Sequence, residues 1–240
     1  MSDTRLDAIP TQWSLIRRAH TQGSPTTAEE ARRILVLRYA PALRRYLGRI
    51  TTDQHAADDL AQDALVRLLR GDFAGADPNR GRFRDLLKES IRNLARNQWS
   101  KEARRRPKNF DLNLLADDDG ATDAGWLVEW RKIVLDFAWA ELKQAEQSQG
   151  GYPYTILRLR TEHPEEKSAQ LAQRLSSLLG SPVRADAARQ MLSRARKRFA
   201  DAVIENVRSC LDDPSFERVQ EELAALELLD LFKTHLADNS

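Results

Sequence analysis

The chain has 240 residues and a formal net charge of only +2, because 38 Lys and Arg face 36 Asp and Glu. Its 31% charged and 41% hydrophobic residues fit a charge-rich helical protein of one or two domains. No apolar run is long enough for a membrane span, the N-terminus has no apolar signal core, and the single Cys210 excludes a disulfide framework, so we expect a cytoplasmic protein.

The first half of the chain predicts helices, because its apolar residues recur at helical rather than alternating spacing. A short helix is expected over residues 11–21 and a long one from Thr26 to about Ile50, with a kink at Pro41. Asp53 is a candidate N-cap of the next helix. That helix has one apolar stripe, formed by Ala57, Leu60, Ala61, Ala64, Leu65 and Leu68.

Glycines and Asp77-Pro78 predict a loop over residues 71–81. A helix with a second apolar stripe follows from Phe83 and ends at Pro107, and on its flank basic residues recur every four positions at Arg84, Lys88, Arg92 and Arg96. Residues 107–125 are polar and acidic without a sustained period, which predicts a linker.

The second half predicts a helix over 126–147, a short helix ending near Glu162, and a helix beginning at His163 or Ser168. Gly180-Ser181-Pro182 is a turn, and a long amphipathic helix follows it over 183–204. An acidic tail helix is expected after Asp213-Pro214.

The small net charge conceals blocks of opposite sign. Residues 80–108 carry eleven bases against three acids, a net of +8, and residues 110–129 carry six acids and no base. Residues 184–198 carry six bases against one acid, a net of +5, and residues 211–240 carry eight acids against two bases, a net of −6. One such block alone indicates a solvated helix face, but two basic blocks on amphipathic helices favour a nucleic-acid partner.

The pair of helices around Gly180 fits a helix-turn-helix, since the second helix is apolar on one side and basic on the other. An ordinary helical hairpin would give the same two stripes, and the dense run Arg194–Arg198 makes DNA binding the better interpretation. In the first basic block, Phe73, Phe83 and Trp99 offer aromatic groups for opened DNA, although Phe83 begins an apolar stripe and is expected in the core.

Catalysis has little support in the sequence. His55, Asp58, Asp59 and Asp63 could on paper bind a divalent metal, but oxygen-ligated sites usually draw ligands from several segments, so a solvated or partner-facing surface is the better interpretation. No nucleophile arrangement and no glycine-rich phosphate loop is present. We therefore predict no catalytic residue, no cofactor and no metal site.

Three ordered motifs resemble a known family. Residues 57–69 resemble the polymerase-binding helix of extracytoplasmic-function (ECF) sigma factors, and residues 83–97 resemble the promoter-melting helix that follows it. Residues 171–175 and 188–199 are similar to the C-terminal helix-turn-helix of that family. The resemblance covers about residues 27–208, and the start at Trp13 and the acidic tail look most like lineages of planctomycete-type bacteria.

The resemblance implies an all-α protein with two helical domains. The chain would consist of five successive segments: an N-terminal extension with a short helix (1–25), sigma domain two (26–106), an acidic linker (107–125), sigma domain four with the helix-turn-helix (126–208) and an acidic C-terminal extension (209–240). The implied partners are core RNA polymerase, through its clamp coiled coil and flap, promoter DNA, and an anti-sigma factor or other regulator. The linker would follow the RNA path of the polymerase, where its six acids would mimic a nucleic-acid backbone.

The resemblance also assigns site residues. Polymerase binding would use Asp58, Asp59, Gln62, Asp63 and Arg67. The minus-ten element, with a flipped base held by the 71–82 loop, would be contacted by Asn79, Arg80, Arg84, Lys88, Arg92, Asn93, Arg96, Asn97 and Trp99. The minus-thirty-five element would be contacted by Arg184, Arg189, Gln190, Ser193, Arg194 and Lys197.

The chain departs from the family pattern around the helix-turn-helix, where Leu171 to Gly180 is about one helical turn longer. The tail beyond residue 210 lies outside the common core, and we expect it to pack against the basic C-terminal domain and restrain DNA binding. The predicted function is an alternative sigma factor that binds core polymerase and opens promoter DNA. The alternatives are a helix-turn-helix regulator that does not bind polymerase and a nucleic-acid enzyme, for which no site is evident.

Overall fold

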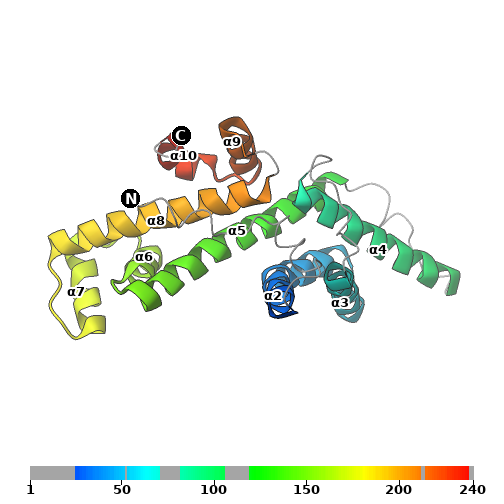
Figure 1. The fold of residues 1–240 in the computed structure, drawn as a ribbon, viewed down its shortest axis with the longest axis horizontal. Helices are drawn as coiled ribbons and strands as arrows, with labels where there is room; N and C mark the ends of the chain where they lie inside the picture. Colours follow the sequence, from blue (N-terminus) through cyan, green and yellow to red (C-terminus); the bar gives the residue numbers. More distant parts are fainter. Residues whose placement is uncertain (1–24, 52, 71–81, 106–118, 212–213, 238–240) are drawn as a thin grey trace. The chain divides into compact units, whose positions relative to one another are not determined.

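A computed structural model describes residues 25–51, 53–70, 82–105, 119–211 and 214–237. These residues form nine α-helices and no strand, which confirms the all-α fold class (Figure 1). The predicted helix over 11–21, the loop over 71–81 and most of the predicted linker lie outside the described residues. None of the described helices is both long enough and apolar enough to cross a membrane.

The helices divide between two compact units. Unit 1 holds α2 (Pro25–Ile50), α3 (Gln54–Arg70), α4 (Phe83–Arg105), the first part of α5 (Asp119–Gln149), the end of α8 and α9 (Phe216–Ala225). Unit 2 holds the rest of α5, then α6 (Pro153–Glu162), α7 (Ser168–Leu179), most of α8 (Ala185–Cys210) and α10 (Leu229–Ala237). The division falls at Ile133 within α5, whereas the sequence placed the boundary at residue 126, where a helix was expected to begin.

In unit 1, α2 and α3 lie side by side and α4 contacts α3 (Figure 1). The predicted cap of α3 is present, because the backbone N–H of His55 donates to the Asp53 carboxylate at 3.0 Å. The predicted stripe of α3 is buried except for Leu65, which is half-buried. Pro41 lies inside α2, which continues through it as one helix.

An aromatic cluster joins α5 to the other helices of unit 1. Trp130 stacks on Tyr39 of α2 with ring centroids 5.7 Å apart, and Trp126 meets Tyr46 edge to face at 5.0 Å. Phe83, the first residue of α4, lies 5.6 Å from Tyr39, so its predicted place in the core is confirmed. Burial raises the pKa of Tyr46 to about 12, so that phenol stays neutral. Trp126 and Trp130 therefore place the start of α5 in the core of unit 1.

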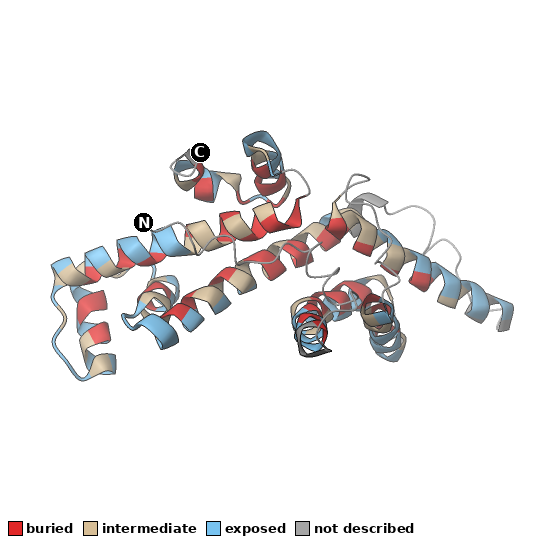
Figure 2. Ribbon diagram, in the orientation of Figure 1, coloured by how far each residue is buried: buried red, intermediate tan, exposed pale blue. Residues whose placement is uncertain are grey.

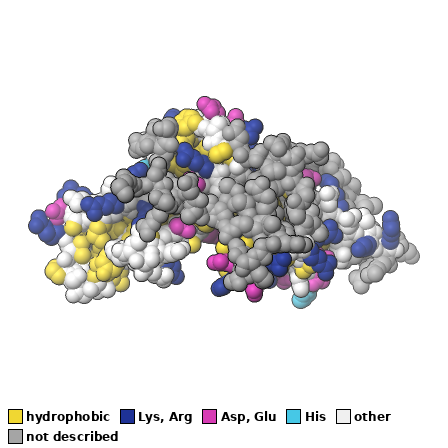
Figure 3. All heavy atoms as spheres, in the orientation of Figure 1, with side chains coloured by type: hydrophobic (Ala, Val, Ile, Leu, Met, Phe, Trp, Pro, Cys, Tyr) yellow, Lys and Arg dark blue, Asp and Glu magenta, His cyan; other side chains and the backbone are white. Residues whose placement is uncertain are grey.

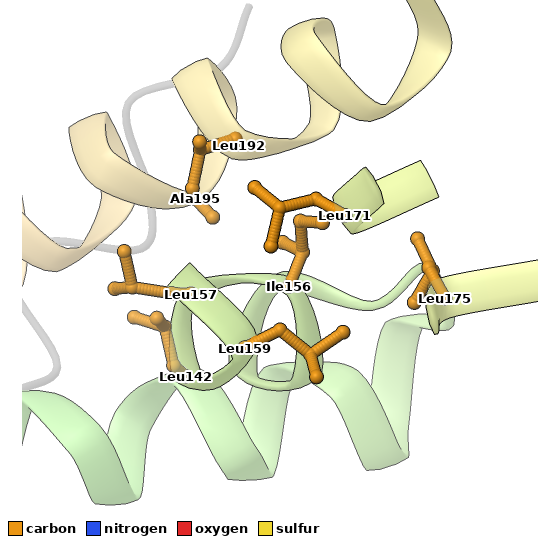
Figure 4. Packing of buried hydrophobic residues seen from close by; sticks show 8 residues of the cluster. All are labelled: Leu142, Ile156, Leu157, Leu159, Leu171, Leu175, Leu192 and Ala195. Carbon is orange, nitrogen blue, oxygen red and sulfur yellow. The ribbon is translucent and has the colours of Figure 1, made fainter. Parts of the chain in front are cut away.

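Unit 2 has its own apolar core, which Figure 4 shows at close range. Side chains from α5, α6, α7 and α8 form one buried cluster, which consists of Leu142, Ile156, Leu157, Leu159, Leu171, Leu175, Leu192 and Ala195. Trp139, Tyr154 and Phe199 pack against its edge. The residues facing outward on α7 and α8 are exposed (Figure 2), as the amphipathic stripes predict.

The acidic tail forms two helices rather than the single one expected. Ser215 caps α9 by accepting from the backbone N–H of Arg218, and the helix ends where Glu227 adopts a positive φ of 53°. The backbone N–H groups of Glu227 and Leu228 satisfy the carbonyls of Ala224 and Leu223 there, which is a left-handed helix stop with Glu in the position that usually holds Gly. As a result α9 belongs to unit 1 and α10 to unit 2, where Phe232 lies 6.3 Å from Phe199 of α8.

We predict that Trp130→Ala destabilises unit 1 by about 3–5 kcal/mol, the usual cost of removing a buried large aromatic side chain. Trp130 is only 1% exposed and contacts rings from both α2 and α4. Urea unfolding followed by helical circular dichroism measures the change. Leu37→Ala on α2 is the matched control, because Leu37 is 66% exposed and its truncation should change stability by less than about 0.5 kcal/mol. Equal effects of the two substitutions would contradict the proposed role of the aromatic cluster.

Candidate nucleic-acid interface

The outer face of α3 carries all five residues that the sequence assigned to polymerase binding. Asp58, Asp59, Gln62, Asp63 and Arg67 are exposed, because the apolar stripe of the same helix turns its other side toward α2 and α4. Their side chains are thus free to meet a partner protein. Within the described residues, no group of three or more His, Cys, Asp or Glu is arranged to hold a metal ion, and the acids of α3 form a surface rather than a ligand cage.

The N-terminal half of α4 is covered by acids from other helices, which the sequence did not predict. Arg84 is only 6% exposed and donates through its Nη1 to Oε1 of Glu222 on α9, a carboxylate that is 2% exposed. Arg82 pairs with the other oxygen of Glu222 at 2.8 Å. One turn further along, Lys88 lies 3.1 Å and Arg92 3.7 Å from the carboxylate of Asp123 on α5.

Burial raises the pKa of the Glu222 carboxyl, and the charges of Arg84 and Arg82 oppose that rise. Arg84, which the sequence assigned to the minus-ten surface, is thus buried in this structure, and its guanidinium forms an internal ion pair. Lys88 and Arg92 are partly covered, with side chains 15% and 14% exposed.

The C-terminal half of α4 is open. Asn93, Arg96 and Asn97 are exposed and Trp99 is half-buried, whereas Asn79 and Arg80 lie outside the described residues. Lys101 and Arg104 are exposed on the same part of the helix, where Figure 3 shows Lys and Arg side chains on the surface. The sequence-based site left these two cations out, although they belong to the basic block 80–108.

A groove of about 280 Å³ runs between α3 and α4. It is lined by Asp63 and Arg67 on one side and by Asn97, Lys101 and Arg104 on the other. Two sets of residues that the sequence assigned to different partners thus share one surface feature. A protein bound to α3 would lie next to nucleic acid bound to α4.

In unit 2, α7 and α8 form two amphipathic helices joined by a tight turn. Gly180 ends α7 with a φ of 63°, a conformation that glycine adopts without strain. The hydroxyl of Ser176 donates to the carbonyl of Ala172 at 2.7 Å and accepts from the backbone N–H of Val183 at 2.8 Å, which fixes the turn. Arg174 donates to Glu166 just before α7 and holds the pKa of that carboxyl below its usual value.

The residues assigned to the minus-thirty-five element lie on the outer face of α8, except for Arg184, which directly precedes the helix. Arg184, Arg189, Gln190, Ser193, Arg194 and Lys197 are all exposed, while Ala188, Leu192 and Ala195 face the core. Arg184 pairs with Asp186 at 3.2 Å and Lys197 with Asp201 at 3.5 Å. Ion pairs between exposed side chains are weak, so these cations can exchange their partners for phosphates.

A buried acid joins α5 to α2. Glu129, whose side chain is fully buried, accepts hydrogen bonds from Arg45 and from Lys132 at 3.0 Å, and it forms an ion pair with Arg49 at 3.1 Å. Burial by itself raises the pKa of this carboxyl, but hydrogen bonds from Arg45 and Lys132 outweigh it and lower the pKa below the ordinary 4.5. Asp123 was assigned to the acidic linker by sequence and Glu129 to the helix that follows it; both belong to the acidic block 110–129, and both pair with bases of unit 1.

Comparison with protein families gives one match, to Sigma-70 region 2, over residues 35–105. The matched segment begins within α2 and ends with α4, so it contains the exposed acidic face of α3 and the basic face of α4. The match covers less than half of the chain and shows that this segment is similar to region 2 of Sigma-70 factors. Neither the comparison with curated proteins nor that with solved structures gives a match.

We predict that Glu129→Gln destabilises the protein by about 1–3 kcal/mol near neutral pH, because charged hydrogen bonds to Arg45 and Lys132 are weakened. A lowered pKa means that the native state favours the ionised carboxylate. Its stabilising effect is therefore present above the ordinary pKa of 4.5 and is lost as the pH falls through the lowered value. Urea unfolding of both proteins between pH 7 and pH 3 measures this, with the difference in unfolding free energy shrinking in acid. A difference that grows in acid would contradict the ion cluster.

Proposed function

We propose that this protein is an alternative sigma factor of the extracytoplasmic-function type, which binds core RNA polymerase, recognises a promoter through two helical domains and opens the DNA without catalysing a reaction. One observation carries the proposal: the segment that matches Sigma-70 region 2 presents an exposed acidic helix face beside an exposed cationic one. The first face fits a basic protein surface, and the second fits nucleic acid.

Promoter opening is assigned to the C-terminal half of α4. Asn93, Arg96 and Asn97 offer donors to phosphates and base edges, and Trp99 next to them offers a ring for stacking of an unpaired base. Lys101 and Arg104 extend the cationic surface. Asn79 and Arg80 complete the proposed surface from outside the described residues.

Recognition of the upstream element is assigned to α8. Its outer face combines Arg189 and Arg194, which match guanine in the major groove, with Gln190, which matches adenine. The turn at Gly180 and the apolar contacts to α7 give this helix the support that a recognition helix needs. Unit 2 would thus serve as sigma domain four.

Fewer acids of the linker are available beside nascent RNA than the sequence suggested. Asp123 and Glu129 pair within unit 1, so four acids are left to mimic a nucleic-acid backbone: Asp119 at the start of α5, and Asp111, Asp117 and Asp118, which lie outside the described residues. An anti-sigma factor that covers one of the basic helices remains part of the proposal.

Run-off transcription with purified core polymerase tests the proposed function. A sigma factor produces transcripts that begin at a defined position on genomic DNA fragments, and the start sites identify the promoter. A helix-turn-helix regulator would bind DNA but produce no transcript, and a nucleic-acid enzyme would degrade the template. Either of these results would overturn the proposal.

We predict that the double substitution Asp59→Arg and Asp63→Arg lowers the affinity for core polymerase at least tenfold, which is about 1.4 kcal/mol or more. Two exposed acids of α3 become cations there, so attraction to a basic partner surface turns into repulsion. Glu29→Arg with Glu30→Arg on the exposed side of α2 makes the same charge change and serves as the control. Fluorescence titration of labelled protein with core polymerase measures both. Equal losses for the two double variants would show a general charge effect instead of a specific surface.

We predict that Arg194→Ala weakens promoter binding by about 1–3 kcal/mol and relaxes base preference at one position of the upstream element. The loss should appear with the cognate promoter and be small with unrelated DNA. Lys143→Ala on the exposed side of α5 is the control within the same unit, and it should change both affinities little. Binding of the polymerase complex to a set of single-base promoter variants measures the preference. An unchanged preference would remove Arg194 from base recognition.

A further inference from the structure

The basic residues in the N-terminal half of α4 form ion pairs with acids of other helices, which the proposed function does not require. Arg82, directly before the helix, and Arg84, Lys88 and Arg92 on it are paired with carboxylates from α5 and α9, which lie outside the matched segment. Arg92 also lies 3.5 Å from Glu89 of α4 itself. On the same helix, Arg96, Lys101 and Arg104 are exposed. The helix therefore has one neutralised half and one open half.

The acids in question come from defined positions. Glu222 faces inward from α9 between Val219 and Leu223, two fully buried apolar residues, so the helix delivers this carboxylate to Arg84 in a fixed place. Arg131 of α5 pairs with Glu227 at the end of α9 and holds the same helix from its other end. Asp123 lies one to two turns before Trp126 and Trp130, whose packing fixes the start of α5 against α2.

We propose that Asp123 and Glu222 act as an internal counter-charge that competes with DNA phosphates for the N-terminal half of α4 and keeps the affinity of the free protein for DNA low. This inference rests on the proposed function, because it assumes that α4 binds nucleic acid. The tail was expected to restrain the basic C-terminal domain, and the contacts of α9 instead direct the restraint to the basic helix of unit 1.

The two carboxylates differ in the way they compete. Asp123 is 45% exposed, and its pairs with Lys88 and Arg92 lie close enough to the surface for a phosphate to replace it. Glu222 and Arg84 are both buried, so DNA gains Arg84 only if α9 moves away from α4. Arg82, which is 32% exposed, lies between these cases and also approaches Glu221 at 3.8 Å. Asp123 thus sets a barrier that DNA itself can overcome, and Glu222 sets one that needs displacement of a helix.

Asp123→Asn, Glu222→Gln and the double variant test the proposal in the full chain without polymerase. Anisotropy of a fluorescent DNA duplex with a single-stranded branch gives the affinity at several salt concentrations. We expect Asp123→Asn to bind about three- to tenfold more tightly than the unaltered chain. Its plot of log affinity against log salt should be steeper by about 1 to 2, because each new phosphate contact adds about 0.9 to that slope. The double variant should bind more tightly still.

Glu217→Gln is the matched control, since Glu217 is an exposed acid of the same α9 and its removal changes the net charge equally. It should leave the affinity and the salt slope almost unchanged. An equal gain in the control, or no gain in Asp123→Asn, would overturn the proposal. Because Glu222→Gln leaves Arg84 buried with a weaker partner, helicity and thermal melting are measured first, and if that variant does not fold, Asp123→Asn decides alone.

Run-off transcription by the unaltered chain separates this inference from the proposed function. Normal initiation together with unchanged DNA affinity in Asp123→Asn would support the proposed sigma-factor function and contradict the proposed internal counter-charge. Absence of initiation would remove the proposed function itself, whatever the variants do in the binding experiment.

Discussion

Packing of the first turns of α5 against α2 determines how unit 1 presents its charges. Trp126 and Trp130 are four residues apart, so they lie on one face of the helix, and Glu129 lies between them on that face. The two rings pack on Tyr46 and Tyr39, and the carboxylate meets Arg45 and Arg49 of the same helix α2. Because these contacts fix both position and rotation of α5, they also fix Asp123 beside Lys88. This packing thus determines that Lys88 and Arg92 of α4 have a carboxylate of α5 beside them.

The positions of the charges in the fold explain why a net charge of +2 says little about the binding partners of the chain. Acids and bases that cancel in the sum do not all meet in space: the acids of α5 and α9 meet bases of α4, whereas the bases on the outer face of α8 remain exposed. Where pairing is buried, as for Arg84 and Glu222, desolvation makes either partner costly without the other. Where it is exposed, as for Arg184 and Asp186, a phosphate can replace the acid at little cost.

Periodicity predicted most of the fold. The stripes of α3 and α4, the Asp53 cap, the Gly180 turn and the outward face of α8 depend on residues close in sequence, and the structure has each of them. Contacts between residues that are distant in sequence could not be predicted from periodicity. A polar and acidic composition made the stretch up to residue 125 resemble a linker, although Trp126 and Trp130 bring the helix that contains Asp123 into the core. The end of α9 near Glu227 could not be predicted from the sequence, because a left-handed helix stop usually carries Gly and this one carries Glu. The side chain of this Glu pairs with Arg131, which is distant in sequence.

The burial of Arg84 shows that a row of basic residues along a helix does not by itself define a DNA-binding surface. Arg84, Lys88, Arg92 and Arg96 are four residues apart, and such a row drifts around the helix because four residues exceed one turn of 3.6. Exposure rises along it, from the buried Arg84 through the half-buried Lys88 and Arg92 to the exposed Arg96. A nucleic-acid surface cannot therefore be inferred from the whole row: the end that enters the core needs its own counter-charges, and the acids of this chain supply them. In the free chain, the part of this helix that is open to the proposed DNA partner begins where the acids of α5 and α9 end.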